Sequence, residues 1–192
     1  MSELIGIERE GEVAVLRLER PAKLNAISTQ MRRDFIEAMA GLAADDSVAA
    51  VVLTGAGRAF SAGQDLGEAV AFTAADVPEK SALALRFFNS VRHLEKPCVA
   101  ALNGIAAGAG FQLALMADLR VAHAGVRMGQ PEVKAGLPSV IGSAIMAWYL
   151  GQAANVELSL TGRLLEAEEA ARLGLVSEIV PEAEVLATAK KR

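Results

Sequence analysis

The sequence predicts a single α/β domain built around a buried, largely parallel sheet. Three short and mostly apolar segments, residues 49–54, 98–102 and 119–122, have the length of strands that are buried on both faces. Segments in which apolar residues recur at helical spacing alternate with these strands. Such alternation is typical of α/β folds, in which helices cover a sheet.

The N-terminal part predicts a β-hairpin followed by a long helix. Apolar residues 5–7 and 13–18 flank a Glu-Gly-Glu turn. Ser28 is a favourable N-cap, and the helix that it opens is expected to run to about Ala44. The buried face of this helix carries apolar residues at helical spacing, namely Met31, Phe35, Met39 and Leu42.

The next part of the chain is less regular. The strand at 49–54 is followed by a segment rich in glycine and alanine, for which we expect a loop over residues 55–67. Residues 68–80 have only a weak pattern and predict a mobile segment. A helix is expected over residues 81–95, with its buried face formed by Leu83, Phe87, Val91 and Leu94.

The remaining elements are short. We expect helices over residues 108–117, 140–150, 152–161 and 167–173, a loop that carries residues 129–132, and a strand over residues 176–180. Residues 182–192 have helical character but end without a cap. We therefore expect one domain over residues 1–192, with a core over about 1–180. Residues 181–192 are expected to begin a C-terminal helical region that is largely missing.

Composition limits the classes of function. The formal net charge is −4 and no basic stripe is present, so we do not expect a nucleic acid partner. No apolar run approaches about 18 residues without a charge or a glycine, and the N-terminus lacks a basic-then-apolar pattern. We therefore expect no membrane span and no export signal, and a cytoplasmic protein. The single Cys98 lies in an apolar run, which predicts a buried, reduced thiol.

Nucleotide and metal sites are not expected. The two Gly-Ala-Gly segments, at residues 55–57 and 108–110, lack the third glycine of a dinucleotide-binding loop, and no Gly-Lys-Ser/Thr sequence occurs. His93 and His123 have no carboxylate or thiol at the spacing of a metal site.

The segment 96–115 carries the strongest chemical signal. An apolar strand leads into small residues and glycines and then into a helix. This arrangement exposes backbone N–H groups at a helix start with few side chains in the way, which suits the stabilisation of a developing negative charge. Glu132 lies in a loop among apolar residues, where it is either a desolvated general base or an exposed glutamate paired with Lys134.

Several segments resemble those of the crotonase superfamily, the enoyl-CoA hydratases and isomerases. The resemblance covers nearly the whole chain, in the order and spacing of the family, through residues 20–26, 60–66, 96–117, 129–132 and 160–176. It implies a ββα-superhelix, in which strand–strand–helix turns repeat and two sheets are roughly perpendicular. It also implies assembly as homotrimers, often paired as hexamers.

The resemblance implies a coenzyme A thioester as substrate and no other cofactor. The backbone N–H groups of Gln64 and Ala109 correspond to the pair that holds the thioester oxygen. Glu132 matches the glutamate of the Gln-Pro-Glu loop, but Gln112 stands where hydratases of the family carry a second glutamate. Ser139 likewise replaces a glycine. A carboxamide orients water but does not exchange a proton at neutral pH.

The resemblance also suggests how the coenzyme is held. The positions that match the CoA-binding loops are Lys23, Ala26, Ala62, Gly63, Asp65 and Leu66. Lys23 is either a phosphate partner or a solvated lysine, and Asp65 is expected to brace its loop more than to touch substrate. The acyl chain is expected near residues 68–88 and 137–142.

These observations lead to an enoyl-CoA hydratase or 3,2-enoyl-CoA isomerase with one glutamate as acid and base. Gln112 favours isomerisation, because a single base suits a proton shuttle between two carbons. The sequence leaves two further functions open. One is an acyl-CoA thioester hydrolase that uses the same N–H groups, and the second is a catalytically impaired acyl-CoA-binding or scaffold protein.

Overall fold

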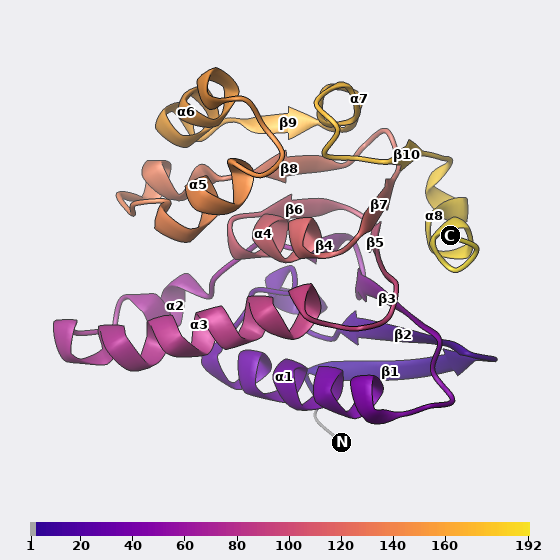
Figure 1. Cartoon of the computed structure of the whole chain (residues 1–192). Coiled ribbons are helices and arrows are strands. Elements are labelled where there is room, and N and C mark those ends of the chain that lie inside the picture. The colour runs from indigo at the N-terminus through magenta and orange to yellow at the C-terminus, as the bar shows by residue number, and fades with distance from the viewer. Residues whose placement is uncertain (1–2) are drawn as a thin grey trace.

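The computed structural model describes residues 3–192 and arranges them around two β-sheets (Figure 1). The larger sheet has the strand order β1-β2-β3-β5-β7-β10; β1 and β2 are antiparallel, and every other neighbouring pair is parallel. Its strands are β1 (Ile5–Glu10), β2 (Val13–Leu18), β3 (Ala50–Gly55), β5 (Cys98–Leu102), β7 (Leu119–Ala122) and β10 (Glu178–Ile179).

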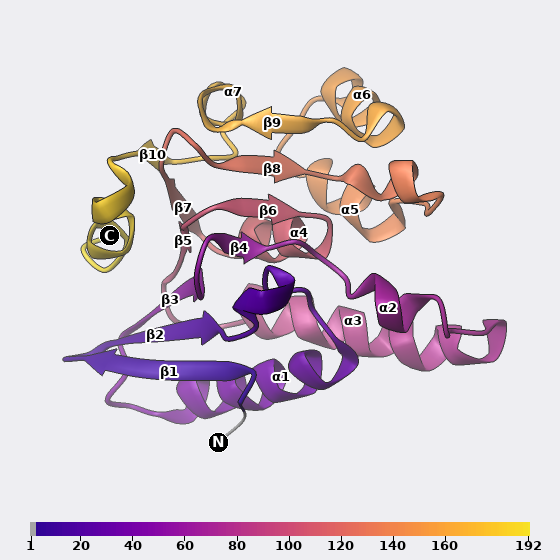
Figure 2. The same cartoon turned by 180° about the vertical axis from the view of Figure 1, so that it is seen from behind.

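The smaller sheet has the order β4-β6-β8-β9, in which only β8 and β9 are antiparallel. Its strands are β4 (Ala59–Ser61), β6 (Ile105–Ala107), β8 (Arg127–Gly129) and β9 (Leu164–Glu166). From behind, the four strands lie above one another in the order in which the chain builds them (Figure 2).

Eight α-helices connect and cover the strands in the described part of the chain. They are α1 (Thr29–Ala44), α2 (Leu66–Ala69), α3 (Val77–Arg92), α4 (Ala109–Met116), α5 (Val140–Met146), α6 (Gln152–Thr161), α7 (Ala167–Arg172) and α8 (Val185–Ala189). The chain repeats one path three times: a strand of the larger sheet, a strand of the smaller sheet, then a helix. β5-β6-α4 and β7-β8-α5 follow it, and so does β3-β4-α3 with the short α2 inserted before α3, so the repeated strand–strand–helix turns expected from the resemblance are confirmed.

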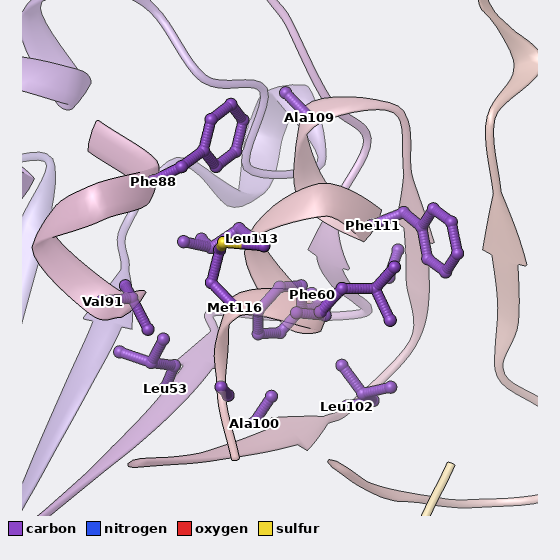
Figure 3. Packing of buried hydrophobic residues seen from close by; sticks show 14 of the residues in the cluster. Leu53, Phe60, Phe88, Val91, Ala100, Leu102, Ala109, Phe111, Leu113 and Met116 are labelled. Atoms are coloured by element: carbon purple, nitrogen blue, oxygen red, sulfur yellow. The ribbon is translucent and has the colours of Figure 1, made fainter. Parts of the chain in front are cut away.

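The main core lies around α4, which is buried along its whole length. Figure 3 shows Phe60, Leu113 and Met116 gathered between α3, α4 and β5. Because every side chain of α4 from residue 109 to residue 116 is buried, the helix has no polar face. Burial on all sides is typical of a helix inside a core, and it anchors the N-terminus of α4 firmly.

A second, smaller core covers the other face of the larger sheet. Side chains alternate between the two faces of a strand, so Val15, Val52, Val99 and Val121 face away from the main core. Val185 and Ala189 of α8 pack on these valines and are each 2% exposed. The C-terminal segment, in which the sequence predicts helical character, thus shields the outer face of the sheet.

The strands of the smaller sheet were not predicted. Residues 59–61, 105–107, 127–129 and 164–166 are too short to show an alternating pattern, and the first of them lies in the segment expected to be a loop. The segment over residues 68–80 is largely helical, whereas the expectation that it is mobile stays a prediction. It contains the end of α2, a 3₁₀ turn at Ala74–Asp76, and the start of α3, which begins four residues earlier than expected.

The other expected elements are present, with shifted ends. The helix expected over residues 81–95 ends at Arg92, that over 140–150 ends at Met146, and the strand expected over 176–180 pairs only at residues 178–179. Within residues 3–192, none of the helices has both the length and the apolar character needed to cross a membrane.

Candidate functional site

A hollow of about 640 Å³ collects residues from distant parts of the chain. Its wall is formed by the loop before α2, by α2 and α3, by the start of α4, and by residues 131–141. Gln64, Ala109, Gln112 and Glu132 all line it. The four residues that the sequence singled out for chemistry therefore share one cavity.

The start of α4, at Gly108 and Ala109, forms part of the wall of this cavity. Gly108 has φ +52° and turns the chain from β6 into the helix. Ala109 is the first helical residue, so its N–H has no acceptor within the helix. Gly108 is also required sterically, because a Cβ at this position would lie 2.9 Å from Oε1 of Glu132. The positive φ and the close approach both favour glycine.

The loop before α2 is pinned against the same helix start. Ile27 N donates to Gly63 O at 2.7 Å, and Asp65 N donates to Ile27 O at 3.1 Å. In this parallel pairing the N–H of Gln64 points away from Ile27. A Cβ on Gly63, which has φ +96°, would lie 3.2 Å from Ala109 N. Because Gly63 has no side chain, its backbone lies close to the start of α4, and the segments that carry Gln64 and Ala109 are side by side.

Glu132 lies on a 3₁₀ turn, Pro131–Ala135, that follows β8. Its side chain is half-buried, and this burial raises the pKa of the carboxyl group above its ordinary value. Gln112 Nε2 donates to Glu132 Oε1 at 3.3 Å. No ion pair joins Glu132 to Lys134 among the described residues, so of the two sequence interpretations the desolvated carboxylate fits the structure.

Gln130 completes a network that the sequence analysis did not include among the site residues. Its side chain is fully buried. An ionised Glu132 requires the amide nitrogen of Gln130 to face it. In that orientation Gln130 donates to both carboxylate oxygens, at 2.7 and 2.8 Å, and accepts from Gln112 Nε2 at 3.3 Å. Ser139 Oγ lies 3.1 Å from the same amide group. The position of Gln130 two residues before Glu132, in Gly-Gln-Pro-Glu, was the available signal.

Comparisons with known proteins identify the family of this chain. Residues 8–192 match the family model described as enoyl-CoA hydratase/isomerase. The chain belongs to the enoyl-CoA hydratase/isomerase family. The resemblance seen in the sequence motifs is thereby confirmed.

Relatives and solved structures of this family cover most of the chain. It is 43% identical over 190 residues to a putative enoyl-CoA hydratase of Thermus thermophilus, covering 97% of this chain and 75% of the relative. It is 35% identical to a short-chain-enoyl-CoA hydratase of Clostridium acetobutylicum, covering 96% and 72%. The crystal structure of an enoyl-CoA hydratase from Mycobacterium smegmatis matches with a TM-score of 0.94 at 33% identity, covering 99% and 75%.

The residues that correspond to the family's CoA-binding loops fall into two groups. Ala26, Ala62 and Leu66 line the cavity, whereas Lys23, Gly63 and Asp65 do not. Gly63 lies behind the wall, against the start of α4. The Lys23 side chain is 61% exposed, with Nζ 3.8 Å from Asp65 Oδ2. A role for Lys23 toward a phosphate therefore requires a ligand that extends out of the cavity.

Asp65 braces its loop, as the sequence analysis expected. Its Oδ2 accepts from Arg20 at 2.7 Å, and Oδ1 accepts from Gly67 N at 2.9 Å. The hydrogen bond from Arg20 holds the pKa of Asp65 below its ordinary value despite the burial. Arg20 also donates to Ala26 O at 2.8 Å, so one guanidinium ties residues 26 and 65 together behind the cavity.

Two other groups lie outside this chemistry. Burial, with a smaller contribution from the charge of Asp118, raises the pKa of the Cys98 thiol to about 12, so the thiol stays protonated at neutral pH. Among residues 3–192 no cluster of three or more metal-ligating side chains is present.

Proposed function

We propose that this member of the enoyl-CoA hydratase/isomerase family moves the double bond of an enoyl-CoA thioester, using Glu132 as the only acid and base. The observation that carries the proposal is the shared cavity. Glu132, whose pKa is raised, lines the same hollow as residues 64 and 109, which carry the proposed backbone donors, and the neighbour of the carboxylate is an amide.

The proposed step is a proton shuttle. Glu132 takes a proton from the α-carbon of a 3-enoyl-CoA, and the electron pair of that C–H bond delocalises onto the thioester oxygen as a dienolate. The N–H groups of Gln64 and Ala109 donate to that oxygen. Glu132 then returns the proton to the γ-carbon, which leaves the double bond conjugated with the thioester. Each backbone donor of this kind is worth about 3–4 kcal/mol in the transition state.

The raised pKa of Glu132 suits both halves of this shuttle. A carboxylate whose pKa lies nearer to neutral is a stronger base than an ordinary glutamate and still releases its proton. Gln130 supports the ionised form, because its amide nitrogen faces both carboxylate oxygens. Gln112 holds Oε1 from the other side but supplies no second acid.

Hydration of a 2-enoyl-CoA is the second candidate. The relatives named above are called hydratases, which favours it. In that reaction Glu132 would be the base that takes a proton from a water molecule, and Gln112 would orient this water. Thioester hydrolysis is the third candidate and binding without turnover is the fourth. The four functions differ in their products.

A small panel of CoA thioesters separates the four. Incubation of a 3-enoyl-CoA, crotonyl-CoA and a saturated acyl-CoA with the protein, followed by mass spectrometry and proton NMR, reports every outcome. We expect the 3-enoyl-CoA to give the conjugated isomer at unchanged mass and faster than crotonyl-CoA gains water. Faster water addition would replace the isomerase proposal by hydration, and free CoA would replace it by hydrolysis. Tight binding without any product would overturn the enzymatic proposal.

A further inference from the structure

Arg32 is a charged residue in the cavity wall that the proposed reaction does not use. It lies on α1 and is only 5% exposed, yet it lines the hollow. The wall formed by α2 and α3 is largely apolar and includes Leu66, Ala69, Ala84 and Phe88. A buried guanidinium in such a wall is unusual, because charged side chains are rarely buried without a partner.

No partner for this guanidinium is present among residues 3–192. Its Nε is buried and makes no hydrogen bond, and no carboxylate lies within ion-pair distance of its nitrogens. Glu68 acts on it only at longer range, and Glu68 Oε2 already accepts from Thr29 N at 2.8 Å. Arginine stays protonated in proteins, so the positive charge remains in the wall without a hydrogen-bonded partner, and the charge of Glu68 offsets only part of the cost of burial.

A second cation lies nearby. Lys80 of α3 also lines the cavity, with Nζ 3.3 Å from Thr29 Oγ1 and 4.7 Å from the centre of the Phe72 ring. Within the described part of the chain, the only carboxylate that lines the same hollow is Glu132, which is held by Gln112 and Gln130. The wall between α1 and α3 therefore carries two positive charges, of which Lys80 is half-buried and interacts with Asp76, whereas Arg32 is buried.

We propose that Arg32 is a specificity-determining residue that pairs with a carboxylate at the far end of the acyl chain. The preferred substrates would then be CoA thioesters of dicarboxylic acids. This inference rests on the proposed function, because it assumes that the acyl chain occupies the hollow.

A carboxylate fits better than a neutral group. A hydroxyl or keto oxygen would accept from the Nε–H but leave the guanidinium charge unpaired. A carboxylate accepts this hydrogen bond and also neutralises the charge, and it can form two parallel hydrogen bonds with a guanidinium. The phosphates of CoA are a second source of negative charge. They are expected near Lys23, outside the cavity, whereas Arg32 lies in its wall.

Binding of saturated thioesters tests the inference without turnover. Calorimetric titration of the protein with glutaryl-CoA and pentanoyl-CoA, and with the longer pair adipyl-CoA and hexanoyl-CoA, compares a carboxylate with a methyl end at equal chain length. In at least one pair we expect the carboxylate form to bind at least about tenfold more tightly, as a charge-assisted hydrogen bond predicts. Equal affinities in both pairs would overturn the inference.

Arg32→Met removes the charge at similar size, and Arg33→Met is the matched control on the exposed neighbour. We expect Arg32→Met to abolish the preference for carboxylate thioesters while leaving the affinity for methyl-ended thioesters and for CoA unchanged. Arg33→Met should keep the preference. If Arg32→Met weakens CoA and all thioesters equally, the guanidinium serves the phosphates, and the inference fails.

Two readouts keep the outcomes distinct. If Arg32 only supports the fold, unliganded Arg32→Met should have a lower Tm than the wild type. If Arg32 is instead an unpaired buried charge, the Tm of the variant should be unchanged or higher. Conversion of methyl-ended 3-enoyl-CoA thioesters by the wild type, without any preference for carboxylate thioesters, would overturn this inference and leave the proposed function intact. A preference for carboxylate thioesters without turnover of any thioester would overturn the proposed function and leave this inference intact.

Discussion

At the scale of single residues, the site depends on the way two amides hold one carboxylate. Gln112 Nε2 donates to Oε1 of Glu132, and the amide nitrogen of Gln130 faces both oxygens. Gly142 leaves room for this arrangement, because a Cβ there would collide with the Gln130 amide. When Glu132 is protonated, the opposite orientation of the Gln130 amide places its oxygen toward the carboxyl group, where it can accept the hydrogen bond from the Glu132 O–H. The network thus accommodates both protonation states.

Glu132→Gln tests the role of this carboxylate. The substitution keeps the shape of the side chain and an acceptor for Gln112, so we expect the protein to fold while turnover of enoyl-CoA thioesters falls by about 10²–10⁴-fold. Steady-state kinetics measures the change. Glu184→Gln, at an exposed site, is the control and should retain wild-type activity. Turnover in Glu132→Gln at the wild-type rate would rule out the proposed mechanism.

The same variant has a predicted effect on stability. The pKa of Glu132 is raised on folding, so this group favours the folded state fully at low pH, and that contribution is lost as the pH rises through the folded value. Glutamine does not titrate. Glu132→Gln should therefore be more stable than the wild type at neutral pH, and the difference should shrink near the ordinary pKa of glutamate. Urea unfolding of both proteins at the two pH values measures this, and a constant difference would contradict the burial argument.

Gln112→Glu tests the proposed division between isomerisation and hydration. A second carboxylate would stand about as close to Glu132 as the amide does now, 3.3 Å, and would supply the missing acid. We expect hydration of crotonyl-CoA to rise at least about tenfold, with some loss of stability from the paired carboxylates. Absorbance of the conjugated thioester follows the reaction, and Gln152→Glu on the exposed start of α6 is the control. Unchanged hydration would remove Gln112 as the deciding residue.

At the scale of elements, the feature closest to the proposed chemistry is the helix start at residues 108–112. α4 is buried on all sides, and its first turn faces the cavity. Leu113 and Met116 of this helix pack among the buried residues of the main core (Figure 3). If the N–H group of Ala109 holds the thioester oxygen, as we propose, the helix dipole adds to its effect, and truncating a side chain would not remove it.

Ala109→Pro removes one of the proposed donors. Proline is well tolerated at the first position of a helix, because its nitrogen has no intrahelical partner to lose. We expect the variant to fold and its turnover to fall by about 10²–10³-fold, which is the effect of losing one oxyanion donor. Gln152→Pro places the same residue at the first position of α6, outside the cavity, and should retain activity. Full turnover by Ala109→Pro would exclude Ala109 from the oxyanion site.

At the scale of the whole molecule, the larger sheet needs cover on both faces. α1, α3 and α4 belong to the main core on one side, and α8 covers valines of four neighbouring strands on the other. The chain reaches this position only after it has completed both sheets. The C-terminal segment therefore supports the stability of the sheet whose strands lead into the site.

Val185→Ala measures this contribution. The side chain is 2% exposed, and removal of two methyl groups from a packed interface is expected to cost about 2 kcal/mol of the free energy of unfolding. Urea denaturation gives the value directly. Val156→Ala makes the same change on α6, where the side chain is 43% exposed, and should cost far less. Equal costs would mean that α8 does not contribute through burial.

The site could be predicted in part from single residues. Glu132 stands out because it is a carboxylate among apolar residues, and the glycines around residue 108 stand out because they separate an apolar strand from a helix. Gln130 and Arg32 were missed. A buried glutamine gives no local signal, and Arg32 follows Met31 on a helix whose other face is polar, so the sequence does not reveal that its side chain is buried. Their roles arise from contacts with residues far away in the chain.

The sequence by itself determined the apolar strands, the long amphipathic helices and the family, because each leaves a pattern within a few neighbouring residues. Only the tertiary structure decided the smaller sheet, whose three-residue strands are defined by pairing with distant segments. It also decided which residues share the cavity. Burial and convergence are properties of segments that meet in space, so Glu132 acquires its raised pKa, and Arg32 its unpaired charge, only in the folded chain.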